Sequence, residues 1–450
     1  MEVSLPVYNV GTSLKYQLYV LFYLYVWYMI NTIFINFRGG IIAPADLYNI
    51  LLAATKVKVR DVHFGLRQQL LVDMEHYNVD AFTAELDNLQ IAYEIDHCKH
   101  PNICSSYPAE DVFIGDSWLS ETIYTTVLNS IDYTPRLKIN ICDSNQSFTP
   151  ILTGNINWVA APSLQNFWHL IIRFPKTNVI YEWNMLCHTD SIAAVTKTIE
   201  ALILQHPDKF IDTELANGDE LFALFNTNNF TLQAAESPVI LPPFNLPYYE
   251  GINRYKEKYW LGIYRRDELF SVRFLMRLCK LCMSTGIQQL CSTNWKTILI
   301  KGIEEKEKEK WNLLLEEFQI NMRHAANELN FQVEDNSIEA LNLKTLLVKH
   351  LSMDDTRSFG ICIGIKTRKK SEEFSSILVR RRYVIDFFGI RLFKVYDILC
   401  AKDFNPNERT GEIYSSGNPV IVLPEQLRRC ILYYYQHRAI VTGAKPSAAK

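Results

Sequence analysis

Residues 33–72 read IFINFRGGIIAPADLYNILLAATKVKVRDVHFGLRQQLLV, and residues 261–300 read LGIYRRDELFSVRFLMRLCKLCMSTGIQQLCSTNWKTILI. The two stretches align over forty positions without a gap. Few positions are identical, so the similarity lies in the spacing of the apolar residues. Each stretch has a short alternating segment, a polar turn, an apolar face with helical spacing and two further strand-like segments. Matched positions include Ile35 and Ile263, Arg38 and Arg266, Leu47 and Leu275, and Leu71 and Leu299.

The order of these segments predicts a fold. After each stretch comes another amphipathic segment, at 79–89 and 304–317, and then a strand-like run, at 91–95 and 320–324. One strand, a helix, two strands, a helix and a last strand make up the ferredoxin-like unit. The sequence therefore predicts two such units related by internal duplication, with two halves that close on each other around a shared cleft.

The rest of the chain predicts a larger α+β unit in each half. The prolines between Pro238 and Pro247 mark the linker between the halves. In the first half, helices are predicted at 120–131, 190–205 and 218–226, and strands at 136–142, 154–160 and 169–174. In the second half, a helix is predicted at 340–351 and strands at 359–366 and 376–383.

The predicted fold class is α+β, in which two ferredoxin-like half-domains alternate with two larger α+β units. The predicted divisions are an apolar N-terminal extension at 1–30, the first ferredoxin-like half-domain at 31–97, the first larger unit at 98–240, the linker and second ferredoxin-like half-domain at 241–330, the second larger unit at 331–438 and a disordered tail at 439–450.

Composition narrows the class of protein. The 450 residues carry a formal net charge of −3, so no overall positive field favours nucleic acid or an acidic membrane. The 10 cysteines are spread over the whole chain instead of forming a compact framework. That distribution is typical of a reducing compartment, where most cysteines act as small apolar residues. We therefore expect a cytoplasmic protein with no nucleic-acid partner.

The N-terminus allows three interpretations. Residues 16–37 carry no charge, and Leu18–Ile30 is strongly apolar, so its length alone permits a membrane helix. Residues 33–37, however, are needed as the first strand of the repeat. The first interpretation is that residues before Met29 are a non-functional extension from an upstream start codon. The second is a membrane anchor, and the third is an extra packed element. We expect the extension, and no association with a membrane.

The turns at the same offset in both repeats carry a family resemblance. Gly65-Leu66-Arg67-Gln68 occupies the position of Thr293-Asn294-Trp295-Lys296. These turns resemble those of the nitrite and sulfite reductases, whose ferredoxin-like units alternate with sirohaem-binding domains. Pro135–Ile139 is similar to a basic segment of the sirohaem domain. More closely, the chain resembles bacterial proteins that join such a body to a C-terminal rubredoxin module, on the segments 39–42, 246–251 and 260–267.

The resemblance implies a tetrapyrrole site between the halves. Sirohaem carries many carboxylates, which Arg and Lys side chains pair with. The cations that the resemblance assigns to this task are Arg67, Arg136, Lys138 and Lys296, with Gln68 as a polar neighbour. Solvated charges at strand ends would explain the same residues. A small oxyanion would seek the same cations, and no catalytic residue is predicted.

The cysteines depart from the family. Its reductases hold a [4Fe–4S] cluster with a Cys-x5-Cys pair and a Cys-x3-Cys pair in the second half. Here Cys98 and Cys104 have the first spacing but follow the first repeat, and the second spacing does not occur. Such clusters use four thiolates, so we expect no cluster of the family type and no metal site. Cys400 and Cys430 alone cannot form a rubredoxin module, which needs two Cys-x-x-Cys pairs.

Weaker motifs have ordinary explanations beside functional ones. Cys279 and Cys282 have a redox or metal spacing, but they align with buried positions of a helix, so we expect core packing. Arg380-Arg381-Arg382 would dock an acidic electron donor or form a plain surface charge run. The run at 304–310 is expected to be a solvated helix face. Nucleotide-binding, zinc and Ser-His-Asp patterns are absent from the sequence, as is the aromatic-basic strand signature of RNA-binding modules.

Two functional hypotheses follow. The first is a redox protein that resembles nitrite/sulfite reductases, acting in electron transfer or as a degenerate sirohaem-type oxidoreductase. It would receive electrons from a separate ferredoxin or rubredoxin. The second is a non-catalytic scaffold that keeps the reductase fold, lacks the cofactor and binds a redox or assembly partner. The sequence leaves open whether the chain is an enzyme.

Overall fold

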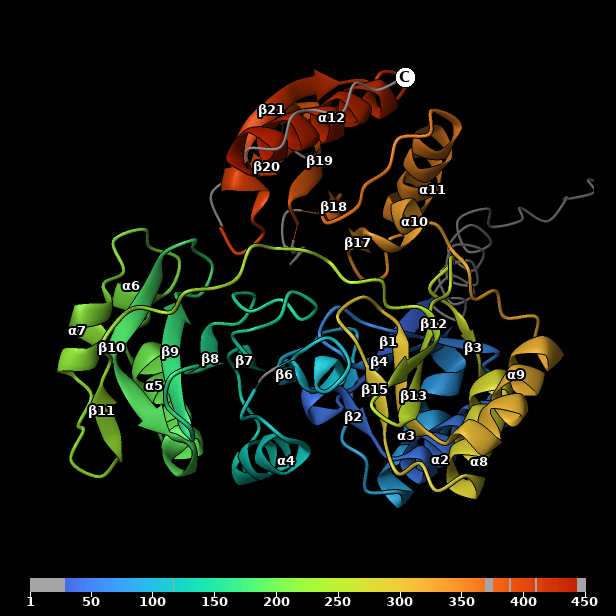
Figure 1. Cartoon of the computed structure of the whole chain (residues 1–450), viewed down its shortest axis with the longest axis horizontal. Helices are drawn as coiled ribbons and strands as arrows, with labels where there is room; N and C mark the ends of the chain where they lie inside the picture. The colour runs from blue at the N-terminus through green and yellow to red at the C-terminus, as the bar shows by residue number, and fades with distance from the viewer. Residues whose placement is uncertain (1–28, 116, 369–374, 388–389, 409–410, 443–450) are drawn as a thin grey trace, which may run out of the picture.

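The computed structural model describes residues 29–115, 117–368, 375–387, 390–408 and 411–442, which form four β-sheets with helices packed on them. Figure 1 shows the two ferredoxin-like units together at the lower right, the first larger unit at the left and the second larger unit above. The linker at 238–247 crosses the middle of the molecule between them. We call the larger units the first mixed unit (residues 98–234) and the second mixed unit (residues 326–442).

The first ferredoxin-like unit has the predicted order of strands and helices along the chain. Its four strands lie in the order β3-β4-β1-β5, and all neighbouring pairs are antiparallel. This is the order in which a βαββαβ chain folds into a ferredoxin-like sheet. Its elements are β1 (Ile30–Ile35), α2 (Pro44–Lys56), β3 (Asp61–Phe64), β4 (Leu70–Glu75), α3 (Val79–Asn88) and β5 (Glu94–Ile95).

The second ferredoxin-like unit differs at one edge. The prediction of a last strand at 320–324 is wrong, because these residues form neither helix nor strand. Instead β12 (Gly251–Tyr255) occupies the edge beside β13, joined to it by a tight turn. A local hairpin supplies the pairing without a long loop closure. The other elements are β13 (Lys258–Ile263), α8 (Val272–Ser284), β15 (Leu290–Ser292), β16 (Ile298–Ile303) and α9 (Lys308–Glu317).

The two units exchange an edge strand with each other. Short β14 (Phe270–Ser271) of the second unit pairs with β3 of the first. Reciprocally, β2 (Ile41–Ile42) of the first unit pairs with β15 of the second. Each exchanged strand directly precedes the first helix of its own unit, so the exchange obeys the internal duplication. The fifth strand of each sheet therefore comes from the other half of the chain.

One hydrophobic core serves both ferredoxin-like units. Helices α2 and α8 pack against each other, and their apolar faces are buried with residues of both sheets. The helix faces predicted from the sequence include Leu47 and Ile50 of α2 and Leu275 and Leu278 of α8, all at most 1% exposed. Cys279 and Cys282 belong to the same core, which confirms the prediction that they are packing residues.

The mixed units repeat a second topology. In each sheet the first two pairs are parallel and the next two are antiparallel. The first unit contains β6 (Cys104–Ser105), α4 (Glu121–Ser130), β7 (Ile139–Cys142), β8 (Ile156–Ala160), β9 (Phe167–Arg173), β10 (Ile180–His188), α5 (Ile192–Gln205), α6 (Pro207–Phe210), α7 (Gly218–Ala223) and β11 (Leu232–Ala234). The second contains α10 (Ala326–Leu329), β17 (Phe331–Val333), α11 (Ile338–Met353), β18 (Ile363–Lys366), β19 (Ile377–Phe387), β20 (Ile390–Ala401), β21 (Gly411–Asn418) and α12 (Leu423–Thr442).

The chain ends are only partly described. Most of the apolar stretch Leu18–Ile30 lies outside the described residues, so its three interpretations stay open. At the other end α12 continues to Thr442, so the prediction of disorder is wrong for residues 439–442, and the remaining tail lies outside the described residues. Among the described helices, none combines the length and hydropathy that crossing a membrane requires.

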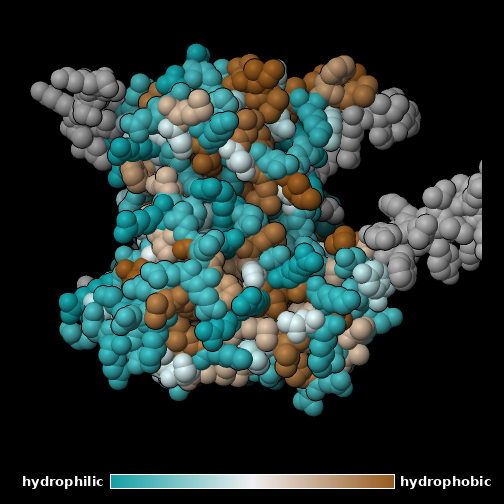
Figure 2. All heavy atoms as spheres, turned by 90° about the vertical axis from the view of Figure 1, so that its right-hand side faces the viewer, coloured by the Kyte–Doolittle hydropathy of each residue, from teal (hydrophilic) through white to brown (hydrophobic). Residues whose placement is uncertain are grey.

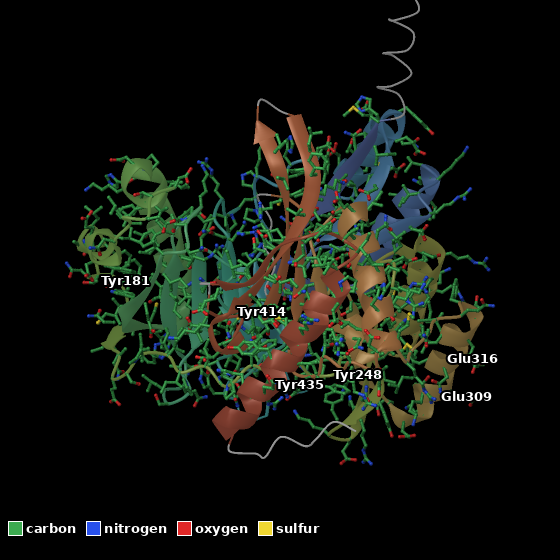
Figure 3. All side chains as sticks on the ribbon, turned by 90° about the horizontal axis from the view of Figure 1, so that it is seen from above. Tyr181, Tyr248, Glu309, Glu316, Tyr414 and Tyr435 are labelled. Carbon is green, nitrogen blue, oxygen red and sulfur yellow. The ribbon has the colours of Figure 1, made fainter. Side chains whose placement is uncertain are left out.

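Surface features distinguish the units. Glu309 and Glu316 of α9 point outward at one side of the molecule in Figure 3, which agrees with the predicted solvated face. Tyr181 of the first mixed unit lies at the opposite side, and Tyr414 and Tyr435 of the second mixed unit lie between. Figure 2 shows hydrophobic side chains exposed on the upper part of the molecule, which the second mixed unit forms.

The strand exchange makes Gly40 a critical position. Its φ is +73°, and a Cβ atom there would lie 2.5 Å from the carbonyl oxygen of Ser292 in β15. We expect Gly40→Ala to lower the free energy of unfolding by about 3 kcal/mol or more, because left-handed strain and a backbone clash add. Chemical denaturation would measure the change.

Gly286→Ala is the matched control for this substitution. Its φ is +76°, but no atom lies within 4 Å of an added Cβ. This variant should lose only about 1 kcal/mol, the cost of the left-handed backbone. Equal losses in the two variants would contradict the exchanged pairing of β2 with β15.

Candidate functional site

Both family-like turns have the same backbone geometry. Gln68 and Lys296 occupy equivalent positions, with φ angles of +61° and +56°. The Gln68 N–H donates to the Gly65 carbonyl at 3.0 Å, and the Lys296 N–H donates to the Thr293 carbonyl at 3.1 Å. Left-handed backbone is uncommon outside glycine. Its occurrence at both positions confirms that the aligned turns are structural equivalents.

These turns meet at the centre of the molecule. The Asn294 side-chain amide donates to the Leu66 carbonyl at 2.8 Å, and the Ser292 hydroxyl donates to the Gln68 carbonyl at 2.7 Å. The Leu66 N–H in turn donates to Asp335 of the second mixed unit at 3.1 Å. Residues from three units therefore bind one another at the join between the halves, where a shared cleft was predicted.

Arg67 is engaged by the backbone of the first mixed unit. Its Nε and Nη2 donate to the Asn102 carbonyl at 3.1 and 2.8 Å, and Nη2 also donates to the Ile139 carbonyl at 3.0 Å. The residue is only 8% exposed. Most of the guanidinium's donors thus satisfy carbonyl groups that would otherwise be buried without partners. This role explains the arginine without a ligand.

Gln68 has a structural role as well. Its side-chain amide nitrogen donates to the Ser105 carbonyl at 2.9 Å, and its amide oxygen accepts from the Ser105 N–H at 2.9 Å. A side chain thereby takes the place of a neighbouring strand beside β6. Gln68 is fully buried and does not line the central cavity.

Lys296 forms a buried charge cluster. Its Nζ lies 2.6 Å from Glu268 Oε2 and 3.3 Å from Asp335 Oδ1, and it donates to the Glu334 carbonyl at 3.3 Å. Burial alone would lower the pKa of Lys296, but the charges of Glu268 and Asp335 raise it above its ordinary value. The ammonium is therefore charged and neutralised by the chain itself.

The remaining predicted cations line a cavity of about 310 Å³ where three of the four units meet. Phe34 and Leu66 belong to the first ferredoxin-like unit, while Asp335 belongs to the second mixed unit. The charged residues that line this central cavity are Arg67, Lys99, Arg136, Lys138, Arg368, Glu334 and Asp335. Of the predicted set, the structure thus brings together Arg67, Arg136 and Lys138. Gln68 and Lys296 do not line the cavity.

Sequence reasoning missed four of the seven charged residues in this lining. Lys99 and Arg368 add two cations, and Glu334 and Asp335 add two carboxylates. Although burial raises the pKa of Glu334, hydrogen bonding by Thr367 and the charge of Arg368 hold it below its ordinary value. The two carboxylates lie about 270 residues after Leu66 in the chain. No local pattern in the sequence signals that proximity.

Lys138 is the most perturbed cation of the cavity. Loss of surrounding water, and then repulsion from Arg67 and Arg173, lower its pKa to about 7. Arg136 is exposed beside it, and its backbone N–H donates to Glu200 at 3.0 Å. A bound anion would relieve this crowding of positive charge and raise the pKa of Lys138.

The two cysteines with family spacing lie near this region as thiols. Loss of water around its sulfur, followed by the charge of Glu94, raises the pKa of Cys98 to about 11. Burial also raises the pKa of Cys104. Within the described residues, no three His, Cys, Asp or Glu side chains are grouped to hold a metal ion. The expectation that no family-type cluster is bound stays a prediction.

The arrangement does not fit sirohaem. A carboxylate-rich tetrapyrrole needs cations that can turn toward it, but Lys296 is held by Glu268 and Asp335, and Arg67 is held by carbonyl groups. Glu334 and Asp335 line the same cavity and would repel the carboxylates of the ligand. A cavity of about 310 Å³ is at the lower end of the range for ligand pockets, about 300–1,000 Å³.

Other charged residues form ion pairs within the chain. His324 Nδ1 lies 2.6 Å from Glu250, and Glu328 pairs with Arg266. The predicted docking arginines are paired too, since Arg380 and Arg382 contact Asp397 at 3.2 and 3.1 Å. Their docking role stays a prediction.

Removing the buried ammonium should be costly. In Lys296→Met, Glu268 would be left as a buried charge without its cation, because the two side chains are only 3% and 9% exposed. We expect the free energy of unfolding to fall by about 3–5 kcal/mol in chemical denaturation. The double variant Lys296→Met, Glu268→Met should recover most of that loss.

The control is Lys56→Met, which breaks an exposed pair with Glu85 and should change stability by less than about 0.5 kcal/mol. If Lys296→Met costs no more than this control, Lys296 is not held by the chain and remains available for a ligand.

Lys138 should make stability depend on pH. Its pKa is about 7 in the folded protein and 10.5 in an ordinary environment, so the unfolded chain binds more protons between these values. The wild-type protein should therefore gain stability as the pH rises from about 7 to 10.5. We expect Lys138→Met to be more stable than wild type at pH 6 by roughly 1–2 kcal/mol, a gain that disappears near pH 10.5.

Denaturation at each pH measures that difference, and Lys176→Met at an exposed pair should show no such trend. A pH-independent effect of Lys138→Met would contradict the lowered pKa.

Comparison with known proteins supports the fold. No protein-family model and no curated protein matches this sequence. Among solved structures, it is similar to the NirA protein of Mycobacterium tuberculosis, with a TM-score of 0.70 and 13% sequence identity. The match covers 92% of this chain and 84% of that chain. At this identity the likeness concerns the fold alone: the chain has the α+β fold of that protein.

Proposed function

We propose that this protein is a non-catalytic binding protein built on the nitrite/sulfite reductase fold, and that its central cavity takes a small oxyanion instead of sirohaem. The observation that carries the proposal is the buried cluster of Lys296 with Glu268 and Asp335. Glu268 and Asp335 already neutralise the Lys296 ammonium, a task that the carboxylates of a bound sirohaem would otherwise have to perform.

The energetics support a cavity without sirohaem. Freeing Lys296 for a ligand would leave Glu268 buried without its cation, which costs about 3–5 kcal/mol. Arg67 would have to give up the carbonyls of Asn102 and Ile139. A cofactor would need to offset both losses before contributing net affinity. A small anion needs neither change.

The chemistry of the lining favours an oxyanion. Lys99, Arg136 and Lys138 all line the cavity from the first mixed unit. Charge-assisted hydrogen bonds from such groups are the usual way in which proteins hold oxyanions. Because water loss and neighbouring arginines lower the pKa of Lys138 to about 7, anion binding should take up a proton near neutral pH.

The second candidate is a sirohaem-type redox protein that receives electrons from a ferredoxin or rubredoxin. The fold likeness to a nitrite/sulfite reductase and the excess of cations in the cavity favour it. It would require Lys296 and Arg67 to exchange their present partners for the cofactor. The rubredoxin-linked group remains the family resemblance behind this candidate.

An absorption spectrum distinguishes the two candidates. The protein is purified anaerobically from cells that also make sirohaem, and its iron content is measured. We expect a colourless, iron-free and folded protein. Its melting temperature should rise when sulfite, nitrite or phosphate is added, because a ligand of the folded state stabilises it. The rise should be lost in Lys138→Met and kept in Lys176→Met.

Tetrapyrrole bands that disappear in an Arg67→Ala, Lys296→Ala variant would overturn the proposal in favour of the sirohaem protein. A colourless protein that none of the three anions stabilises would support the scaffold without the anion site.

A further inference from the structure

A second, larger cavity lies in the first mixed unit, away from the central cavity. It has a volume of about 820 Å³ and is lined by three loops and by the linker. Asp143, Ser144 and Asn145 follow β7, Pro162, Ser163 and Gln165 follow β8, and Ser117 and Trp118 precede α4. The strands β6, β7 and β8 are parallel, so the loops after β7 and β8 leave the sheet at the same edge.

That edge is where open sheets with parallel strands bind ligands. The carboxyl ends of adjacent parallel strands hold loops that diverge and leave a crevice. Here the linker closes the crevice on one side. Two hydrogen bonds attach the linker to the first mixed unit on either side of the cavity-lining residues. The Val239 N–H donates to Glu182 at 2.7 Å, and the Asn245 N–H donates to Ser147 at 3.3 Å. Ile240 and Pro242 between these anchors line the cavity.

The lining combines apolar side chains with hydroxyl and amide groups and is almost uncharged. Asp143 is its one charged residue among those described, and lysine, arginine and histidine are absent from that lining. Asp143 is 2% exposed, accepts from the Asn145 N–H at 2.6 Å and is bonded by the Ser117 hydroxyl. A carboxylate offers about four acceptor positions, so it can accept further hydrogen bonds. An anionic ligand finds no counter-charge in this cavity.

Trp118 gives the cavity a fixed aromatic wall. Its indole N–H donates to the Ala161 carbonyl at 2.8 Å. Its ring packs edge to face on Trp168, with the two ring centroids 5.4 Å apart. The polar end of the indole is thus satisfied within the protein, and the partly exposed ring offers only apolar surface. Gln165 and Ser163, both exposed, provide hydroxyl and amide groups on the β8 loop.

We propose that this cavity binds a neutral, hydroxyl-rich ring compound, either a free sugar or the ribose of a nucleoside. Such a ligand places its apolar face on an aromatic ring and its hydroxyl groups against carboxylate, amide and hydroxyl side chains. The volume lies within the range of about 300–1,000 Å³ for ligand pockets. The proposal rests on neither the central cavity nor the fold comparison.

Isothermal titration of the full chain tests this. The probes are glucose, ribose and adenosine, with sulfite and choline as anionic and cationic references. At least one hydroxylated probe should saturate the protein at a concentration below about 10 mM, while the references should not compete with it. Glucose or ribose alone would indicate a sugar, and adenosine alone a nucleoside. Gln165→Ala and Trp118→Ala should each weaken binding at least fivefold.

The matched control is Gln205→Ala, which removes an exposed glutamine outside this cavity and should leave binding unchanged. Since Gln165 is exposed, its loss should not disturb folding even if Trp118→Ala does. The proposal is overturned if none of the hydroxylated probes saturates below that concentration, if choline displaces them, or if Gln165→Ala and Gln205→Ala behave alike.

Discussion

The contact between two tight turns, at 65–69 and 293–297, is the constraint on which the rest of the structure depends. Both turns need a left-handed residue, and the second repeat donates to carbonyls of the first turn: Asn294 to Leu66, and Ser292, just before its own turn, to Gln68. The ferredoxin-like sheets, their shared core and the central cavity are arranged around this contact. A change in either turn would therefore act on both halves of the molecule at once.

The repeated elements could be predicted from the sequence, but the contacts between the repeats could not. Helical spacing identified the buried faces of α2 and α8, because a helix face of several turns leaves a clear period. The exchanged strands β2 and β14 have two residues each, which is too short for any period. The strand β12 was missed because a hairpin before the repeat took the place of the expected run at 320–324.

The candidate site shows the same limit in its charges. Arg67, Arg136 and Lys138 were predicted from local resemblance, and they do line one cavity. Glu268 and Asp335, which neutralise Lys296, lie on other segments that only the tertiary fold brings close. A cation that local sequence assigns to a ligand can thus be bound already by a distant carboxylate. In this protein Lys296 is such a cation.

The exchange of β2 and β14 also affects how the chain is made. During synthesis β3 leaves the ribosome about 200 residues before β14, the strand that covers its edge. At about 5–20 residues per second, that edge stays open for roughly 10–40 s. An open edge pairs readily with a strand of another chain. Two nascent copies that exchange β14 would form an intertwined dimer, so a slow ribosome or a crowded polysome favours swapped assemblies over the monomer.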